Sequence, residues 1–72
     1  MYSPEEIGKY LRELRIKAGV SQETVAKSIG VSREAYSMYE RGIRNPSDDT
    51  KISIAEYFHK SVGSIFFRKT GT

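Results

Sequence analysis

The side chains best suited to contacting a partner lie in one short segment, residues 32–42. It begins with a helix-capping serine and ends with a glycine, and a helical wheel of about 100° per residue gives it two faces. Tyr36 and Tyr39 share the face that we expect to point inward. The other face carries the polar groups and a thioether: Arg33, Glu34, Ser37, Met38 and Arg41. Arginine can donate two hydrogen bonds to guanine, glutamate can accept one from cytosine, and methionine can contact a thymine methyl group. This face could therefore read base edges, although a simple solvated surface is the alternative.

The composition limits the other kinds of chemistry. The chain has 72 residues, no cysteine and one histidine, so we expect one domain without a metal site, a cofactor or a catalytic set. We interpret His59 as an ordinary residue near a helix end, and no small-molecule ligand is evident. A net charge of +3 gives mild support to a polyanionic partner. Because no long apolar run and no hydrophobic leader are present, we expect a cytoplasmic protein with no contact to a membrane.

Serines and glycines divide the chain into five predicted helices. Each helix follows a serine that can cap its N-terminus: Ser3, Ser21, Ser32, Ser47 and Ser61. The first three cover 4–18, 22–29 and 33–41, and each is followed by a glycine. A fourth begins at Asp48, and a short fifth covers about 62–67. No stretch alternates like a strand, so the sequence predicts an all-α fold.

Apolar residues at helical spacing predict which sides of these helices are buried. The first helix has a stripe of Ile7, Tyr10, Leu11, Leu14 and Ala18. The second is expected to bury Val25, Ala26 and Ile29. The fourth is expected to bury Ile52, Ile54, Ala55 and Phe58. Two residues depart from the pattern, because Lys51 falls inside the apolar arc of the fourth helix and Ile16 points away from the first stripe.

The second and third helices are joined by only a few residues, GVS at 30–32. A turn this short that contains glycine forces two helices to cross steeply, which is the geometry of a helix-turn-helix. The sequence therefore predicts this motif over residues 22–41. In such a motif the second helix lies in the major groove of DNA, with its N-terminal residues at the base edges.

Several motifs follow one another in a characteristic order between residues 7 and 67: LRELR, GVSQE, GVS, ERG with NPS, and IAEYF with SVGSIFF. In this combination the chain resembles the phage-repressor and Cro-type family of helix-turn-helix proteins, also called the XRE family. The resemblance implies a compact five-helix bundle of the lambda-repressor-like type over residues 1–67. Residues 68–72 would form a flexible basic tail. One departure is the pair His59 and Lys60, which follows Phe58 where the family often has a glycine.

The resemblance also assigns roles to individual residues. Base contacts are expected from the positions that match the family's reading helix: Arg33, Glu34, Ser37 and Met38. Phosphate contacts are expected from four further residues: Gln22, Ser32, Arg41 and Arg44. The alternatives are that Gln22 and the two arginines are merely exposed, that Ser32 serves only as a cap, and that Glu34 pairs with a neighbouring arginine.

Two further roles concern structure and assembly. Arg15 and Glu40 match positions that form a partly buried ion pair in the family, which would hold the first and third helices together. Phe67 would face outward from a complete monomer, so it is either a dimer contact or a peripheral core residue. Family members usually bind palindromic sites as twofold dimers.

The sequence therefore predicts a sequence-specific DNA-binding transcriptional regulator, a repressor of phage or mobile-element type that binds a palindromic operator as a homodimer. The sequence argues against an enzyme, because it offers no plausible set of catalytic side chains. The alternative is a protein-interaction module such as an antitoxin, which would use the same scaffold to bind a partner protein. Salt dependence separates the two, because binding to DNA weakens linearly with the logarithm of the salt concentration.

Overall fold

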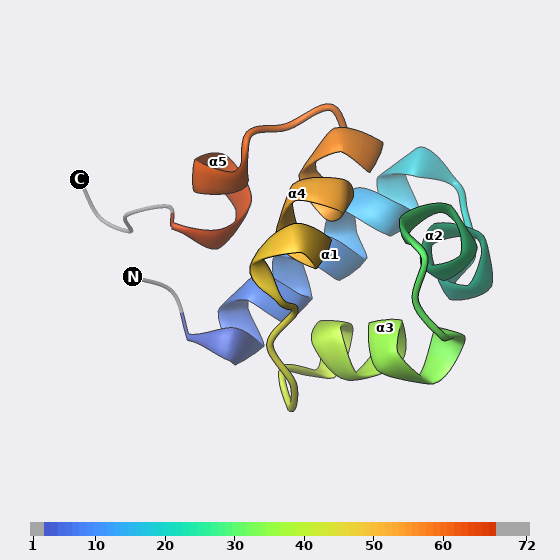
Figure 1. Cartoon of the computed structure of the whole chain (residues 1–72), viewed down its shortest axis with the longest axis horizontal. Helices are drawn as coiled ribbons and strands as arrows, with labels where there is room; N and C mark the ends of the chain where they lie inside the picture. The colour runs from blue at the N-terminus through green and yellow to red at the C-terminus, as the bar shows by residue number, and fades with distance from the viewer. Residues whose placement is uncertain (1–2, 68–72) are drawn as a thin grey trace.

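The computed structural model describes residues 3–67, which form five α-helices and no strand (Figure 1). The helices are α1 (Pro4–Ala18), α2 (Gln22–Ile29), α3 (Arg33–Arg41), α4 (Asp48–Tyr57) and α5 (Val62–Phe66). The all-α prediction is confirmed. The last helix ends one residue earlier than expected, and the predicted tail, 68–72, lies outside the described residues.

The five predicted serine caps are confirmed. Each serine side chain accepts a hydrogen bond from the backbone N–H three residues further on, which satisfies a donor that the helix itself leaves free. At Ser3 the Glu6 carboxylate also accepts a hydrogen bond from the Ser3 backbone N–H, so α1 begins with a complete capping box. Helices α1, α2 and α3 end at glycines with positive φ, as predicted.

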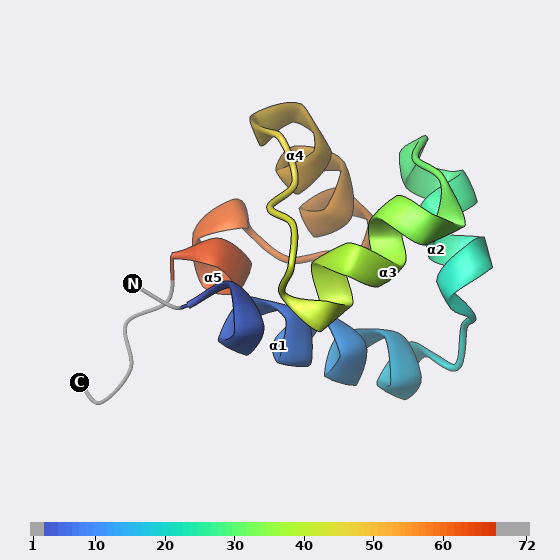
Figure 2. The ribbon, with the colours of Figure 1, turned by 90° about the horizontal axis from the view of Figure 1, so that it is seen from below.

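The helices pack around one small core. Helix α3 lies against α1 and α2, α4 lies against α2 and α5, and α5 closes the bundle on α1 (Figures 1 and 2). The buried apolar residues come from all five helices: Leu11, Val25, Ala26, Ala35, Tyr36, Tyr39, Ile54, Ala55, Ile65 and Phe66. Ile7, Tyr10, Leu14, Ile29 and Phe58 pack against this core while remaining partly exposed. The core therefore fixes α3 along its length.

Two predicted core residues are exposed. Ile52 is 48% exposed, because a helix that buries Ile54 points a residue two positions earlier about 200° away. Ala18 is exposed at the last turn of α1. Lys51, by contrast, is half-buried: its Nζ lies 5.7 Å from the ring centroid of Phe66 and 5.4 Å from that of Phe67. Its stem covers apolar surface while its charge meets two ring faces.

Gly8, which the sequence did not single out, allows α1 and α3 to come together. It is buried, and a Cβ atom there would lie 2.6 Å from the carbonyl oxygen of Tyr39 and would also overlap that of Glu40. Both obstacles are backbone atoms of α3, so they move only with the whole helix. The absence of a side chain at Gly8 therefore sets the distance between the two helices.

We expect Gly8→Ala to lower the free energy of unfolding by about 1–3 kcal/mol, because the added methyl group forces α1 and α3 apart. Gly63→Ala is the matched control, since a Cβ at Gly63 meets no atom within 4 Å. That substitution should raise stability by about 0.5–1 kcal/mol through helix propensity. Urea unfolding followed by circular dichroism measures both. Equal stabilities of the two variants would contradict the close approach.

Candidate nucleic-acid interface

Helix α3 presents one face to solvent along its length (Figure 2). A shallow depression on this face is lined by Arg33, Glu34, Ser37, Met38 and Arg41. Arg33, Glu34 and Arg41 are exposed, while Ser37 and Met38 are half-buried between them. The structure thus brings together the four predicted base-contacting residues and one of the predicted phosphate-contacting arginines. We call these five residues the reading face.

The opposite side of α3 is its anchor. Tyr36 is fully buried and Tyr39 nearly so, which confirms that the tyrosines face inward. Their rings meet edge to face, with centroids 6.2 Å apart and planes at 87°. Two large buried rings one turn apart hold both the position and the rotation of the helix. The helix that carries the reading face is therefore held against rotation about its own axis.

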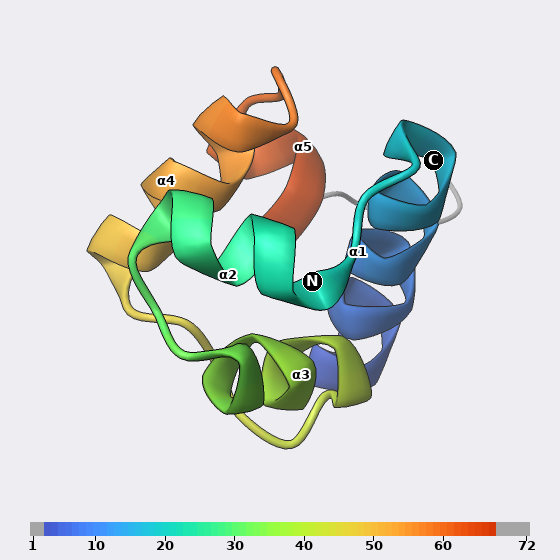
Figure 3. The same cartoon turned by 90° about the vertical axis from the view of Figure 1, so that its right-hand side faces the viewer.

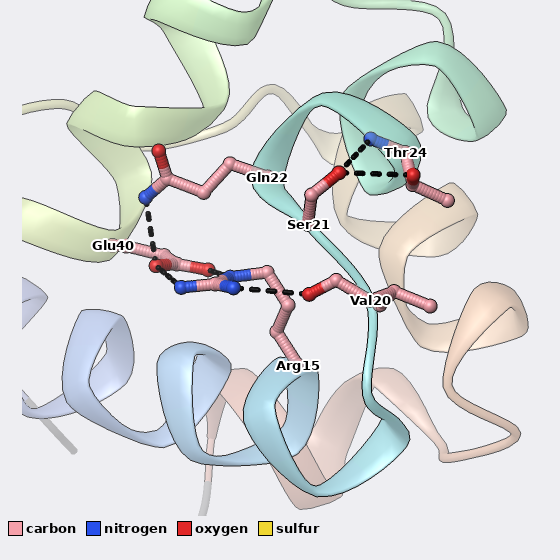
Figure 4. A network of polar contacts seen from close by, with 6 residues as sticks. All are labelled: Arg15, Val20, Ser21, Gln22, Thr24 and Glu40. Carbon is pink, nitrogen blue, oxygen red and sulfur yellow. Dashed lines mark hydrogen bonds and ion pairs between the residues drawn. The ribbon is translucent and has the colours of Figure 1, made fainter.

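A buried ion pair ties α3 to α1 (Figure 4). Arg15 Nε donates to Glu40 Oε2 at 2.7 Å, and Arg15 Nη2 donates to Oε1 at 3.2 Å. The Glu40 side chain is only 2% exposed and that of Arg15 15%. The hydrogen bond from Arg15 to Glu40 is the main cause that raises the pKa of the guanidinium. Arg15 also donates through Nη1 to the carbonyl oxygen of Val20 at 3.0 Å, so it braces the turn before α2.

Gln22 joins the same network, which the sequence did not predict. Its Nε2 donates to Glu40 Oε1 at 2.9 Å, so one carboxylate receives bonds from α1 and α2 (Figure 4). Gln22 is the first residue of α2, where backbone N–H groups are free for an anion. A contact between residues 18 positions apart leaves no local signal in the sequence.

The remaining predicted phosphate-contacting residues lie around the reading face. The Ser32 side chain caps α3 by accepting from the Ala35 N–H at 3.0 Å, and Arg44 is exposed in the loop after α3. Among residues 3–67, Arg33, Arg41 and Arg44 have no carboxylate partner, and Glu34 forms no ion pair with a neighbouring arginine. Within the described part of the chain, three guanidinium groups without a carboxylate partner therefore lie on or next to α3.

Phe67 lies apart from this set. It is the residue after α5 and is 55% exposed. Figure 2 shows α5 at the opposite end of the bundle from α2. In the described part of the chain, no cluster of three potential metal ligands occurs. None of the helices described there is long and apolar enough to cross a membrane.

We expect Glu40→Ala to lower the free energy of unfolding by about 3–5 kcal/mol, because it leaves the Arg15 charge buried without its partner. Glu34→Ala is the control, since Glu34 is exposed and its change should stay within about 0.5 kcal/mol. Thermal melting of both variants measures the difference. Equal melting temperatures would show that the ion pair does not hold α3.

Because the Tyr36 hydroxyl is buried, we expect the protein to lose stability at high pH. Burial is the main cause that raises its pKa, and the nearby Glu40 carboxylate adds to the effect. A phenol with a raised pKa keeps its stabilising contribution below its unfolded pKa of about 10 and loses it as the pH rises further.

The stability of the parent protein relative to Tyr36→Phe should therefore be constant up to pH 10 or so and then fall by at most about 1.4 kcal/mol per pH unit. Among residues 3–67 the hydroxyl has no hydrogen-bond partner, so the variant should fold normally at neutral pH. Urea unfolding from pH 7 to 11.5 or so measures the difference. A difference that is independent of pH would contradict the burial of an un-ionised phenol.

Comparison with known proteins places the chain in a family. The model of the helix-turn-helix family matches residues 11–65. An uncharacterized HTH-type transcriptional regulator from Archaeoglobus fulgidus is 39% identical over 56 residues, which cover 78% of this chain and 80% of the relative. The transcriptional repressor RstR of the cryptic phage CTXphi, from Vibrio cholerae, is 35% identical over 48 residues. That match covers 67% of this chain but only 43% of RstR.

Solved structures agree with this assignment. The restriction-modification controller protein C.AhdI from Aeromonas hydrophila superimposes with a TM-score of 0.82 and 34% identity, over 89% of this chain and 93% of that one. The clp gene regulator ClgR from Corynebacterium glutamicum also gives 0.82, with 27% identity over 93% of this chain and 71% of that one. The similar proteins are named as regulators and not as enzymes. The family resemblance and the fold class predicted from the sequence are confirmed: the chain belongs to the helix-turn-helix family of transcriptional regulators.

Proposed function

We propose that this protein is a sequence-specific DNA-binding repressor of phage or mobile-element type, acting in the cytoplasm. The observation that carries the proposal is the reading face, whose polar groups are gathered on a helix that the core holds rigidly. A helix held in this way enters the major groove without losing conformational freedom on binding.

Each residue of the reading face has a distinct role in this proposal. Arg33, at the first position of α3, donates to guanine, and Ser37 bonds with a neighbouring base one turn later. Glu34 accepts from the amino group of cytosine, and Met38 contacts a thymine methyl group. Ser37 and Met38 are half-buried, whereas Arg33 and Glu34 are exposed. The side chains of the reading face would therefore reach base edges at different depths in the groove.

Phosphates on either side of the groove hold the protein in register. The Gln22 amide has two N–H groups, and because Glu40 takes one of them the other remains for a phosphate at the start of α2. Arg41 and Arg44 bind the backbone beyond the other end of α3, and the Ser32 hydroxyl donates to a phosphate while its lone pair caps the helix. Glu40 thus connects the phosphate contact at Gln22 to the reading face.

The active form in this proposal is a homodimer on a palindromic operator. Phe67, directly after α5, and Ile52, on α4, are exposed apolar residues that do not line the reading face, and they would pack against a second copy. A twofold dimer places its two reading helices in successive major grooves, about 34 Å apart.

The test is selection of bound duplexes from random fragments, followed by affinity measurements at several salt concentrations. We expect Arg33→Ala to cost about 1–3 kcal/mol and to relax the preference at one base pair. Arg44→Ala should weaken binding to all sequences equally and reduce the salt slope by about 1. Failure to bind any duplex, or an affinity that does not change with salt, would contradict the proposal and favour a protein partner.

A further inference from the structure

A hollow of about 480 Å³ lies between the C-terminal ends of α1 and α4. In Figure 3 these ends are at the top of the view, whereas α3 is at the bottom. The floor of the hollow is apolar and is formed by Leu14, Val20, Tyr57 and Phe58. The rings of Tyr57 and Phe58 meet edge to face, with centroids 5.0 Å apart. A concave apolar surface of this volume matches the sites that hold small molecules.

The rim of the hollow is basic. Lys17, His59 and Lys60 line it, and none of the acidic residues within 3–67 does. The carbonyl groups at the two helix ends are largely occupied, since Lys60 N–H donates to Ala55 and Gly19 N–H donates to Ile16. The rim therefore carries two ammonium groups beside helix ends whose carbonyl groups are mostly hydrogen-bonded.

The backbone at the rim is fixed in an unusual conformation. His59 has a φ of 57°, and in the described part of the chain it is the one residue other than glycine with a positive φ. A side chain in this region costs on the order of a kilocalorie per mole relative to glycine, which typically ends helices in this conformation. The Cβ of His59 places an imidazole at the rim where glycine would leave none. Strain of this kind is concentrated at functional sites.

Two contacts connect the walls of the hollow to α3. The carbonyl oxygen of Val20, a floor residue, accepts the hydrogen bond from Arg15, which also holds Glu40 of α3 (Figure 4). Tyr57, another floor residue, packs against the buried core cluster that includes Tyr36 of α3. A molecule in the hollow therefore touches the hydrogen-bond acceptor of Arg15 and a ring that packs on the core beneath α3.

We propose that this hollow is an effector site for a small molecule with an apolar body and a carboxylate, and that its occupation is transmitted to α3. The apolar body lies on the aromatic floor, and the carboxylate binds between Lys17 and Lys60. The hollow lies on the opposite side of the domain from α3 (Figure 3), so a ligand in it leaves α3 free to bind its own partner at the same time. This inference goes beyond the proposed function and does not depend on it.

The test uses the whole chain labelled with ¹⁵N, with 4-phenylbutyrate as the probe and 4-phenylbutanamide as its uncharged match. We expect saturable shifts of the Val20, Tyr57 and Lys60 amide signals, with a dissociation constant on the order of 1 mM for so small a ligand. The uncharged amide should bind at least about fivefold more weakly, because it lacks the charge that the lysines attract. The Tyr36 and Glu40 signals on α3 should shift in parallel with those of the hollow.

Charge variants provide the control. Lys17→Gln combined with Lys60→Gln should weaken the binding of 4-phenylbutyrate about tenfold. Lys9→Gln combined with Lys27→Gln removes the same charge from exposed lysines that do not line the hollow, and it should leave the affinity unchanged. The absence of saturable shifts, equal binding of the uncharged probe, or equal losses in the two double variants would overturn the site. Shifts confined to the hollow would overturn its connection to α3.

Discussion

The structure depends on one buried carboxylate. Glu40 is the penultimate residue of α3, its side chain is almost completely buried, and a charge in that position is tolerated only if its oxygens are bonded. Arg15 supplies two N–H groups from α1, and Gln22 supplies one from the start of α2. A single side chain of α3 thereby fixes its position relative to both neighbouring helices. A shift of α3 away from α1 would leave the buried Glu40 charge unpaired, so we expect the three helices to keep this arrangement or to lose it as a unit.

Other features of the fold serve the same contact. Gly8 lets α1 approach the carbonyl groups of Tyr39 and Glu40, which brings the Glu40 side chain within reach of Arg15. Tyr36 and Tyr39 are buried on the same inward side of α3 as Glu40, so they hold that side of the helix in the core. The outward half of α3 takes no part in this packing. Its residues can therefore be substituted without a large effect on stability.

The local signals in the sequence were sufficient for the helices and for the reading face. Serine caps, glycine ends and the inward tyrosines follow rules that act within one or two helical turns, and all are present in the structure. What the sequence could not show depends on how helices pack. The role of Gly8 and the bond from Gln22 to Glu40 each arise from a neighbour distant in the chain. The exposure of Ile52 follows from helix geometry once packing has chosen Ile54 as the buried residue. The hollow between α1 and α4 has the same origin, because it is formed by two helix ends that only the fold brings together.

The most direct test of the account is the coupling free energy between Arg15 and Glu40, measured by a double-mutant cycle in urea. Arg15→Met and Glu40→Gln keep most of the side-chain volume and remove one charge each. If the pair holds the bundle together, each single variant is strongly destabilised, the double variant recovers part of the loss, and the coupling is about 2 kcal/mol or more. A coupling below about 0.5 kcal/mol would mean that the two changes are additive, as they are for independent surface residues, and would contradict the central role of Glu40.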